Sequence, residues 1–170
     1  WSNPSSVKNN SFINEFERRV KDSFLQNWFT KKENSGTLEL YNYIKLNFEY
    51  ESYLDIVPCS LRVYLSRIRL SSHPLRIQTG RYAQNRLPRE ERVCLCCNVG
   101  LIEDEFHFVL VCSYFNDARK KYIKPYFYNH PNLHKLIELF TNSSKTSILK
   151  LALFIKESLR IRSSILNDIT

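Results

Sequence analysis

Four side chains that can bind a soft metal ion fall close together in the stretch CLCCNVGLIEDEFHFVLVC. Cys94 and Cys97 form a C-x2-C pair, and His107 and Cys112 follow after nine and four intervening residues. The two sulfurs of a C-x2-C turn converge on one edge of a tetrahedron, which is the arrangement that zinc requires. Three thiolates and one imidazole would complete a closed structural site. The spacing therefore predicts a zinc-binding unit over residues 93–124.

The ligand set and its geometry stay open on spacing alone. Cys96 adds a third thiol beside the pair, so it either replaces one partner or takes no part in binding. Residues five positions apart in an unbroken α-helix point about 140° away from each other. His107 and Cys112 can therefore share one metal only if the segment is kinked or the helix ends between them. Ser113 is a candidate N-cap just there. The competing interpretation is a buried apolar run in which Cys112 is a small hydrophobe.

The rest of the chain has the periodicity of helices. Glycine is scarce, with 3 in 170 residues, and long apolar-periodic stretches favour helix over a β-sandwich. We expect helices at residues 11–29, 37–50, 117–124, 132–140 and 144–163, and another that opens at Pro58–Ser60 and stops at His73–Pro74. The expected fold is mostly α, a small helical domain with an embedded zinc-knuckle-like loop-helix unit.

The expected organisation has four segments in one compact unit, which we interpret as a piece of a longer polypeptide because the chain contains no Met. These segments are an amphipathic helical segment (1–58), an arginine-rich helix and loop (59–92), the zinc-binding unit (93–124) and the C-terminal helices (125–170).

The first expected helix has a narrow apolar face. Phe12, Phe16, Val20, Phe24 and Trp28 recur at strict i, i+4 spacing. Such a face normally packs on a core or another helix. A membrane surface is the competing partner, but acidic and basic residues are mixed on the polar side. No apolar stretch approaches the roughly 18 residues of a membrane-spanning helix, and we expect no membrane partner.

Positive charge is concentrated in one fifth of the chain. The net charge is +8 and the isoelectric point about 9.3, which points to an anionic partner. We define the arginine strip as Arg62, Arg67, Arg69, Arg76, Arg81, Arg86, Arg89 and Arg92. Guanidinium groups bind phosphate bidentately and stack on bases, so the strip predicts nucleic-acid binding. The competing interpretation is a solvated face whose arginines pair with acids such as Glu103, Asp104 and Glu105.

Three successive motifs connect the strip to the cysteine cluster. They have the forms R-x-S-x-H-x-L-x-I-x-x-G-R, R-x-C-x-x-C and D-E-x-H-F-x-x-x-C. The matching residues are Arg69, Ser71, His73, Leu75, Ile77, Gly80, Arg81, Arg92, Cys94, Cys97, Asp104, Glu105, His107, Phe108 and Cys112. With these motifs, residues 65–122 resemble the C-terminal region of LINE-like, non-LTR retrotransposon reverse transcriptases. The resemblance covers about a third of the chain, and Cys96 departs from the usual pattern.

The resemblance implies a Cys-Cys-His-Cys zinc knuckle at Cys94, Cys97, His107 and Cys112. It implies a non-catalytic tail that follows the polymerase and grips element RNA or target DNA during target-primed reverse transcription. The implied partners are nucleic acid and the rest of the parent polymerase. The implied location is intracellular, in nucleus and cytoplasm as a ribonucleoprotein. The alternative is a zinc-braced structural or protein-interaction module that packs on a larger polymerase.

The sequence also argues against catalysis by this chain. It has no Tyr-x-Asp-Asp signature, and two-metal phosphoryl transfer needs clustered carboxylates to hold magnesium. Its one dense acidic group, residues 103–105, suits the first turn of a helix. A Cys–His nucleophile would need an exposed sulfur and an accessible base, whereas His107 lies in an apolar run. We therefore expect no enzymatic activity, although the parent protein would be an RNA-directed DNA polymerase.

Overall fold

The computed structural model describes residues 5–82, 84, 86–97 and 99–169. The chain forms two compact units, Trp1–Leu38 and Glu39–Thr170. The division falls after Leu38 and not at residue 58, so the second expected helix belongs to the larger unit. The described residues are mostly helical and contain no strand longer than an isolated bridge, which confirms the predicted fold class.

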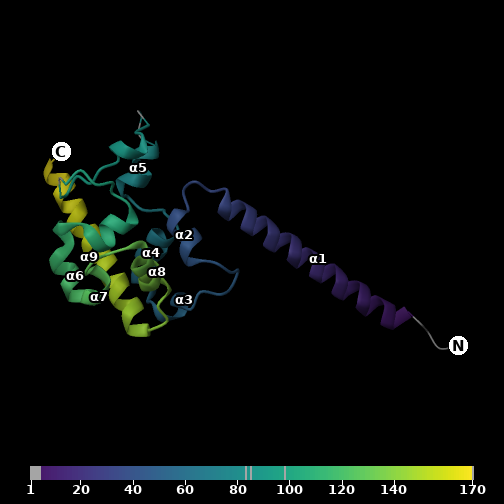
Figure 1. Cartoon of the computed structure of the whole chain (residues 1–170). Coiled ribbons are helices and arrows are strands. Elements are labelled where there is room, and N and C mark those ends of the chain that lie inside the picture. Colours follow the sequence, from purple (N-terminus) through teal and green to yellow (C-terminus); the bar gives the residue numbers. More distant parts are fainter. Residues whose placement is uncertain (1–4, 83, 85, 98, 170) are drawn as a thin grey trace. The chain divides into compact units, whose positions relative to one another are not determined.

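The helices are coloured along the chain in Figure 1. Those of the first 82 residues are α1 (Ser5–Glu33), α2 (Glu39–Ile44), α3 (Tyr53–Ile56), α4 (Cys59–Arg69) and α5 (Arg76–Tyr82). The middle of the chain carries three short turns, η1 (Arg89–Glu91), η2 (His107–Val111) and η3 (Ser113–Phe115). The last four are α6 (Asn116–Tyr122), α7 (Pro125–Tyr128), α8 (Leu133–Thr141) and α9 (Lys145–Ile169).

The smaller unit consists mainly of α1, the purple helix of Figure 1. On its polar side Glu15 bonds to Arg18 and Arg19 at 2.7–3.0 Å, as residues one turn apart do on a helix. Its apolar residues Phe12 and Phe16 are 73% and 59% exposed. Val20 and Phe24, on the face that we expected to pack on a core, are also more than half exposed.

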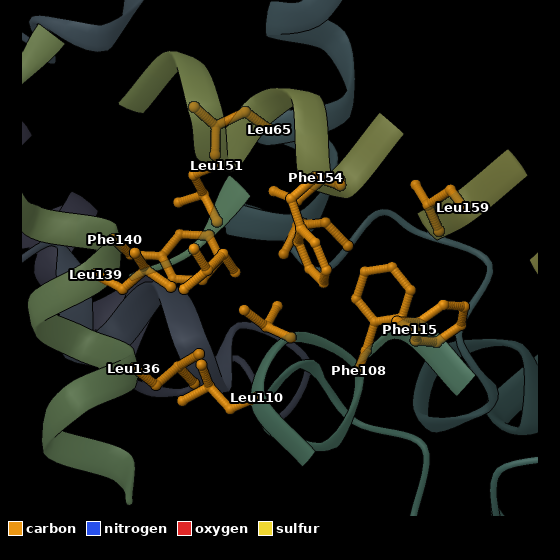
Figure 2. Packing of buried hydrophobic residues seen from close by; sticks show 14 of the residues in the cluster. Leu65, Phe108, Leu110, Phe115, Leu136, Leu139, Phe140, Leu151, Phe154 and Leu159 are labelled. Carbon is orange, nitrogen blue, oxygen red and sulfur yellow. The ribbon is translucent and has the colours of Figure 1, made fainter. Parts of the chain in front are cut away.

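The larger unit packs around α9. Both α4 and α6 lie against α9, and α8 also contacts it. Phe108 of η2 meets Phe115 of η3 and Phe154 of α9, with ring centroids 5.0 and 6.0 Å apart (Figure 2). Burying a side chain of this size contributes roughly 1.5–3 kcal/mol. The core therefore holds η2 firmly.

Several element boundaries follow from local chemistry. α8 begins where the Asn132 side chain accepts a hydrogen bond from the Lys135 N–H at 2.9 Å, an N-cap contact. Pro125 was expected only to end a helix. Because it lacks an N–H it also suits a first helical position, and it opens α7.

Three expectations about local structure were wrong. The second helix covers only Glu39–Ile44 of the expected 37–50. The helix expected to run from Pro58–Ser60 to His73–Pro74 is α4, which begins at Cys59 but already ends at Arg69. The expected loop after Ser71 contains α5, whose Ile77 N–H bonds to the Glu103 carbonyl at 3.1 Å. This last helix depends on a tertiary contact that no local pattern shows.

Candidate metal centre

The C-x2-C pair lies in a tight turn that a short antiparallel bridge closes. Val93 pairs with Ile102, and the Cys94 N–H bonds to the Leu101 carbonyl at 2.9 Å. Gly100 has a φ of +76°, a left-handed conformation that glycine adopts without strain. The turn thus fixes Cys94 beside the start of the helical segment that follows.

The second half of the site is built by a π-helix. The Cys112 N–H bonds to the His107 carbonyl at 2.7 Å, an i→i+5 hydrogen bond. This wider turn returns residue i+5 to nearly the same face as residue i, which an α-helix would not do. The predicted obstacle to a shared metal is therefore removed by a local change of helix type. The backbone also turns at Cys112, where φ and ψ are −53° and 118°. Ser113 begins η3 and caps no helix with its side chain.

The predicted ligands meet around one point. The four ligand atoms of Cys94, Cys97, His107 and Cys112 all lie within 4.8 Å of one another. The Cys94 and Cys112 sulfurs are 3.9 Å apart, and the Cys97 sulfur is 3.3 Å from His107 Nε2. Three of the residues are buried and Cys97 is half-buried. This group could hold a metal ion.

Cys96 lies beside the quartet and outside it. Its sulfur groups with Cys94 and a carboxylate oxygen of Glu103, again within 4.8 Å. Hydrogen bonding with Cys94 raises the pKa of the Cys96 thiol, as burial also does. Cys96 is thus placed to donate its S–H toward Cys94. Cys59 is exposed, and the chain's five cysteines are free thiols.

Hydrogen bonding within the site shifts the pKa values of Cys94 and Cys112 in opposite directions. Hydrogen bonds from the Cys112 and Cys96 thiols lower the pKa of Cys94. The same contact with Cys94 raises the pKa of Cys112. A negative sulfur at Cys94 surrounded by thiol donors is the arrangement expected of a ligand set that shares its protons. Further thiolates form when a cation displaces those protons.

The acidic triplet, which we define as Glu103, Asp104 and Glu105, lies next to this site, and each acid has a different hydrogen-bond partner. The Asp104 carboxylate accepts the His107 N–H at 2.8 Å, as a cap at the start of the helical turn. Burial raises the pKa of Asp104, against the effect of that hydrogen bond. Glu105 is buried and bonds to His73 Nε2 at 2.8 Å and to the Ser71 hydroxyl at 3.0 Å. Burial alone would raise the pKa of Glu105. The hydrogen bond and the electrostatic interaction with His73 outweigh this effect and hold the pKa of Glu105 below its usual value.

Glu103 joins the metal-binding region to α9. Its carboxylate is 1% exposed and accepts bonds from Arg162 Nε at 2.6 Å and Nη2 at 2.8 Å. The Arg76 N–H donates a third bond at 2.8 Å. Sequence reasoning missed this role. From the sequence we expected residues 103–105 in the first turn of a helix.

Arg119 completes the π-helix. Its guanidinium donates to the Val109 carbonyl and to the Cys112 carbonyl, both at 2.8 Å. These carbonyls lie where the helical bonding pattern changes, and a buried carbonyl without a partner is costly. Arg119 is 2% exposed, and this burial lowers its pKa. In the sequence it cannot be told from the neighbouring surface lysines.

The arginine strip is divided by the structure into exposed and structural members. Arg69 is 6% exposed and bonds to the Phe140 carbonyl at 2.8 Å and to Glu51. Arg92 donates to the Leu87 and Ile77 carbonyls at 2.7–3.2 Å. The guanidinium groups of these two arginines are therefore engaged within the fold.

The remaining strip arginines are partly or fully accessible. Arg62 donates to the Val57 carbonyl at 3.1 Å and Arg81 to the Ile77 carbonyl at 3.2 Å, and both residues are half-buried. Arg67, Arg86 and Arg89 are exposed. Arg76 is half-buried, and its Nε has no hydrogen-bond partner within the described residues.

Comparisons with protein-family models, with curated proteins and with solved structures find no match. Among the described residues, no helix has the length and apolar character of a membrane span. The conclusions on function therefore come from the residues themselves.

Proposed function

We propose that the quartet holds Zn²⁺ as a structural site. Three cysteines and one histidine form a donor set that zinc takes in closed four-coordinate sites. Zinc–sulfur bonds of about 2.3 Å and a zinc–nitrogen bond of about 2.0 Å place tetrahedral ligands roughly 3.8 Å apart for two sulfurs and 3.5 Å for sulfur and nitrogen. The corresponding distances here are 3.9 and 3.3 Å, so the residues fit the ion. With four protein ligands, no position is left for a substrate.

We further propose that the chain is a non-catalytic nucleic-acid-binding module. By its resemblance it would grip RNA or DNA as the tail of a non-LTR retrotransposon reverse transcriptase. One observation carries this proposal. Among the described residues, the side chains of residues 103–105 have partners other than the guanidinium groups of the arginine strip, so these acids do not neutralise it there. Glu103 binds Arg162, Glu105 binds His73, and Asp104 caps His107.

The exposed part of the strip stays positive. No ion pair forms at Arg67 or Arg86 among the described residues, and Arg89 has a single exposed one, with Glu39 at 3.1 Å. An exposed pair of this kind contributes roughly 0–1 kcal/mol and can open for a phosphate. The zinc unit would fix the strip by anchoring the turn that follows Arg92.

The test is binding of a fluorescein-labelled single-stranded RNA and DNA to the zinc-loaded chain, followed by anisotropy at several salt concentrations. A variant with Arg67→Gln, Arg86→Gln and Arg89→Gln loses three exposed charges. Its matched control carries Arg18→Gln, Arg19→Gln and Arg160→Gln. Each lost phosphate contact reduces the slope of log K against log salt by roughly 0.7, so we expect a slope smaller by about 2 in the strip variant only.

Two results would reject nucleic-acid binding by the strip. One is wild-type binding no tighter than that of a neutral protein at low salt. The other is an equal loss in both triple variants. The second outcome would favour the alternative module that packs on a larger polymerase. The exposed Phe12 and Phe16 of α1 are the observation in favour of that alternative.

A further inference from the structure

A hollow of about 310 Å³ lies between the end of α6, the connection to α7 and the first half of α9. Its lining includes Lys120, Lys121, Lys124 and Lys150 and, within the described chain, no aspartate or glutamate. Lys121 is paired at 3.2 Å with Glu157, which lies outside the lining. The other three lysines are exposed and form no ion pair with any described residue. The hollow therefore attracts anions.

The bottom of the hollow is apolar. Ile123, Phe127, Leu139 and Leu151 line it and are each at most 4% exposed. The half-buried Tyr122 also contributes to the lining, and its hydroxyl is occupied by a bond to a glutamate at 2.7 Å. A ligand that fills the hollow must therefore combine an anionic group at the rim with a less polar body. Inorganic phosphate alone would leave the apolar part of the hollow to water.

Hydroxyl groups complete the rim. Ser144, Thr146 and Ser147 line the hollow at the start of α9, a helix of 25 residues. Hydroxyls can donate to anionic oxygens, and the positive end of the helix dipole adds to the field of the lysines. Lysine ammonium groups bind phosphate as mobile point charges and need no fixed bidentate geometry.

We propose that this hollow is a nucleotide-binding pocket, with the phosphate among the lysines and the base or sugar on the apolar floor. Its volume lies at the lower end of the range of small-ligand sites, which are mostly apolar with a few convergent polar groups. The nucleotide is either free or one unit of a strand. In the second case the inference rests on the proposed nucleic-acid binding. The pocket shares no lining residue with the metal centre or the arginine strip.

The test is titration of the ¹⁵N-labelled zinc-loaded chain with adenosine 5′-monophosphate, inorganic phosphate and adenosine at low salt. The pocket variant carries Lys120→Gln, Lys124→Gln and Lys150→Gln. Its control carries Lys21→Gln, Lys31→Gln and Lys156→Gln, three exposed lysines outside the lining.

We expect the monophosphate to shift the amide signals of Tyr122 and Ser147 and to bind at least tenfold more tightly than phosphate or adenosine. The pocket variant should lose at least tenfold in affinity, and the control less than twofold. Three results would overturn the proposal: no shift at these amides, equal binding of inorganic phosphate, or an equal loss in the control.

A second arm separates the two sources of the nucleotide. If an oligothymidylate displaces the monophosphate from the pocket, the ligand is a nucleic-acid strand. If the oligothymidylate binds the chain without displacing the monophosphate, the ligand is the free nucleotide. The strip variant with Arg67→Gln, Arg86→Gln and Arg89→Gln should bind the monophosphate normally. If the chain binds the oligonucleotide but the monophosphate does not shift the pocket signals, the nucleotide-pocket proposal is rejected and the proposed nucleic-acid binding is retained.

Discussion

The buried pair of Glu103 and Arg162 gives the sharpest prediction about how the metal-binding region is held. Arg162→Leu removes the two bonds of 2.6 and 2.8 Å and leaves the 1% exposed carboxylate with the Arg76 N–H alone. Breaking a buried pair on one side costs about 3–5 kcal/mol.

The measurement is urea unfolding of the zinc-loaded chain at pH 7, for Arg162→Leu and for Arg162→Leu combined with Glu103→Gln. The second change removes the buried charge, so the double variant should regain much of the lost free energy of unfolding. Arg160→Leu is the matched control, because Arg160 is an exposed neighbour on the same helix. Its effect should stay within about 0.5 kcal/mol.

Two outcomes would refute the reasoning. An Arg162→Leu penalty below about 1 kcal/mol at pH 7 would mean that Glu103 reaches water or another donor. A double variant no more stable than Arg162→Leu would mean that the loss comes from packing of the arginine stem and not from the buried carboxylate.

Three further predictions concern the metal, the packing of α5 and acid stability. Cys97→Ser should abolish stoichiometric zinc binding in metal analysis of the purified chain, whereas Cys96→Ser should retain it; equal retention in both would remove Cys97 from the ligand set. Gly80→Ala should lower the free energy of unfolding by about 1–2 kcal/mol, because the new Cβ would lie 2.8 Å from Cγ of Arg92. The same change in an Arg92→Ala background should cost nothing, and an equal cost in both backgrounds would contradict this cause. The lowered pKa of Glu105 means that its ionised form stabilises the fold at pH values above 4.5, its usual value, and that this contribution is lost as the pH falls through the folded-state pKa. The unfolding free energy should therefore fall more steeply with acid in the wild type than in Glu105→Gln, and parallel curves would show that Glu105 is not responsible.

The sequence predicted those parts of the molecule that depend on local chemistry. The pattern of residues 132–140 predicted a short helix, and α8 forms at Leu133–Thr141. The ligand quartet was predicted from spacing because a metal imposes the same distances on any chain that binds it. The expected helix at 144–163 also forms, although α9 continues to Ile169.

What the sequence did not show depends on tertiary partners. α5 contains Gly80 and little local helix preference, and its packing on Arg92 and Glu103 is known only in the folded chain. The buried roles of Arg119 and Arg162 have no local signature, because an arginine with a long apolar stem suits a surface equally well. The i→i+5 turn at His107 likewise has no local signature, because the Val109 and Cys112 carbonyls there accept hydrogen bonds from the distant Arg119 side chain.

The π-helix relates the spacing of His107 and Cys112 in the sequence to the width of the helical turn between them. With three residues between histidine and cysteine, an ordinary α-helix would already place both on one side, and a single added residue would rotate the cysteine away. The wider turn at η2 accommodates that added residue and keeps His107 and Cys112 on one side of the helix. In any other sequence of this pattern, a four-residue interval would require either the same widened turn or a helix end between the two ligands.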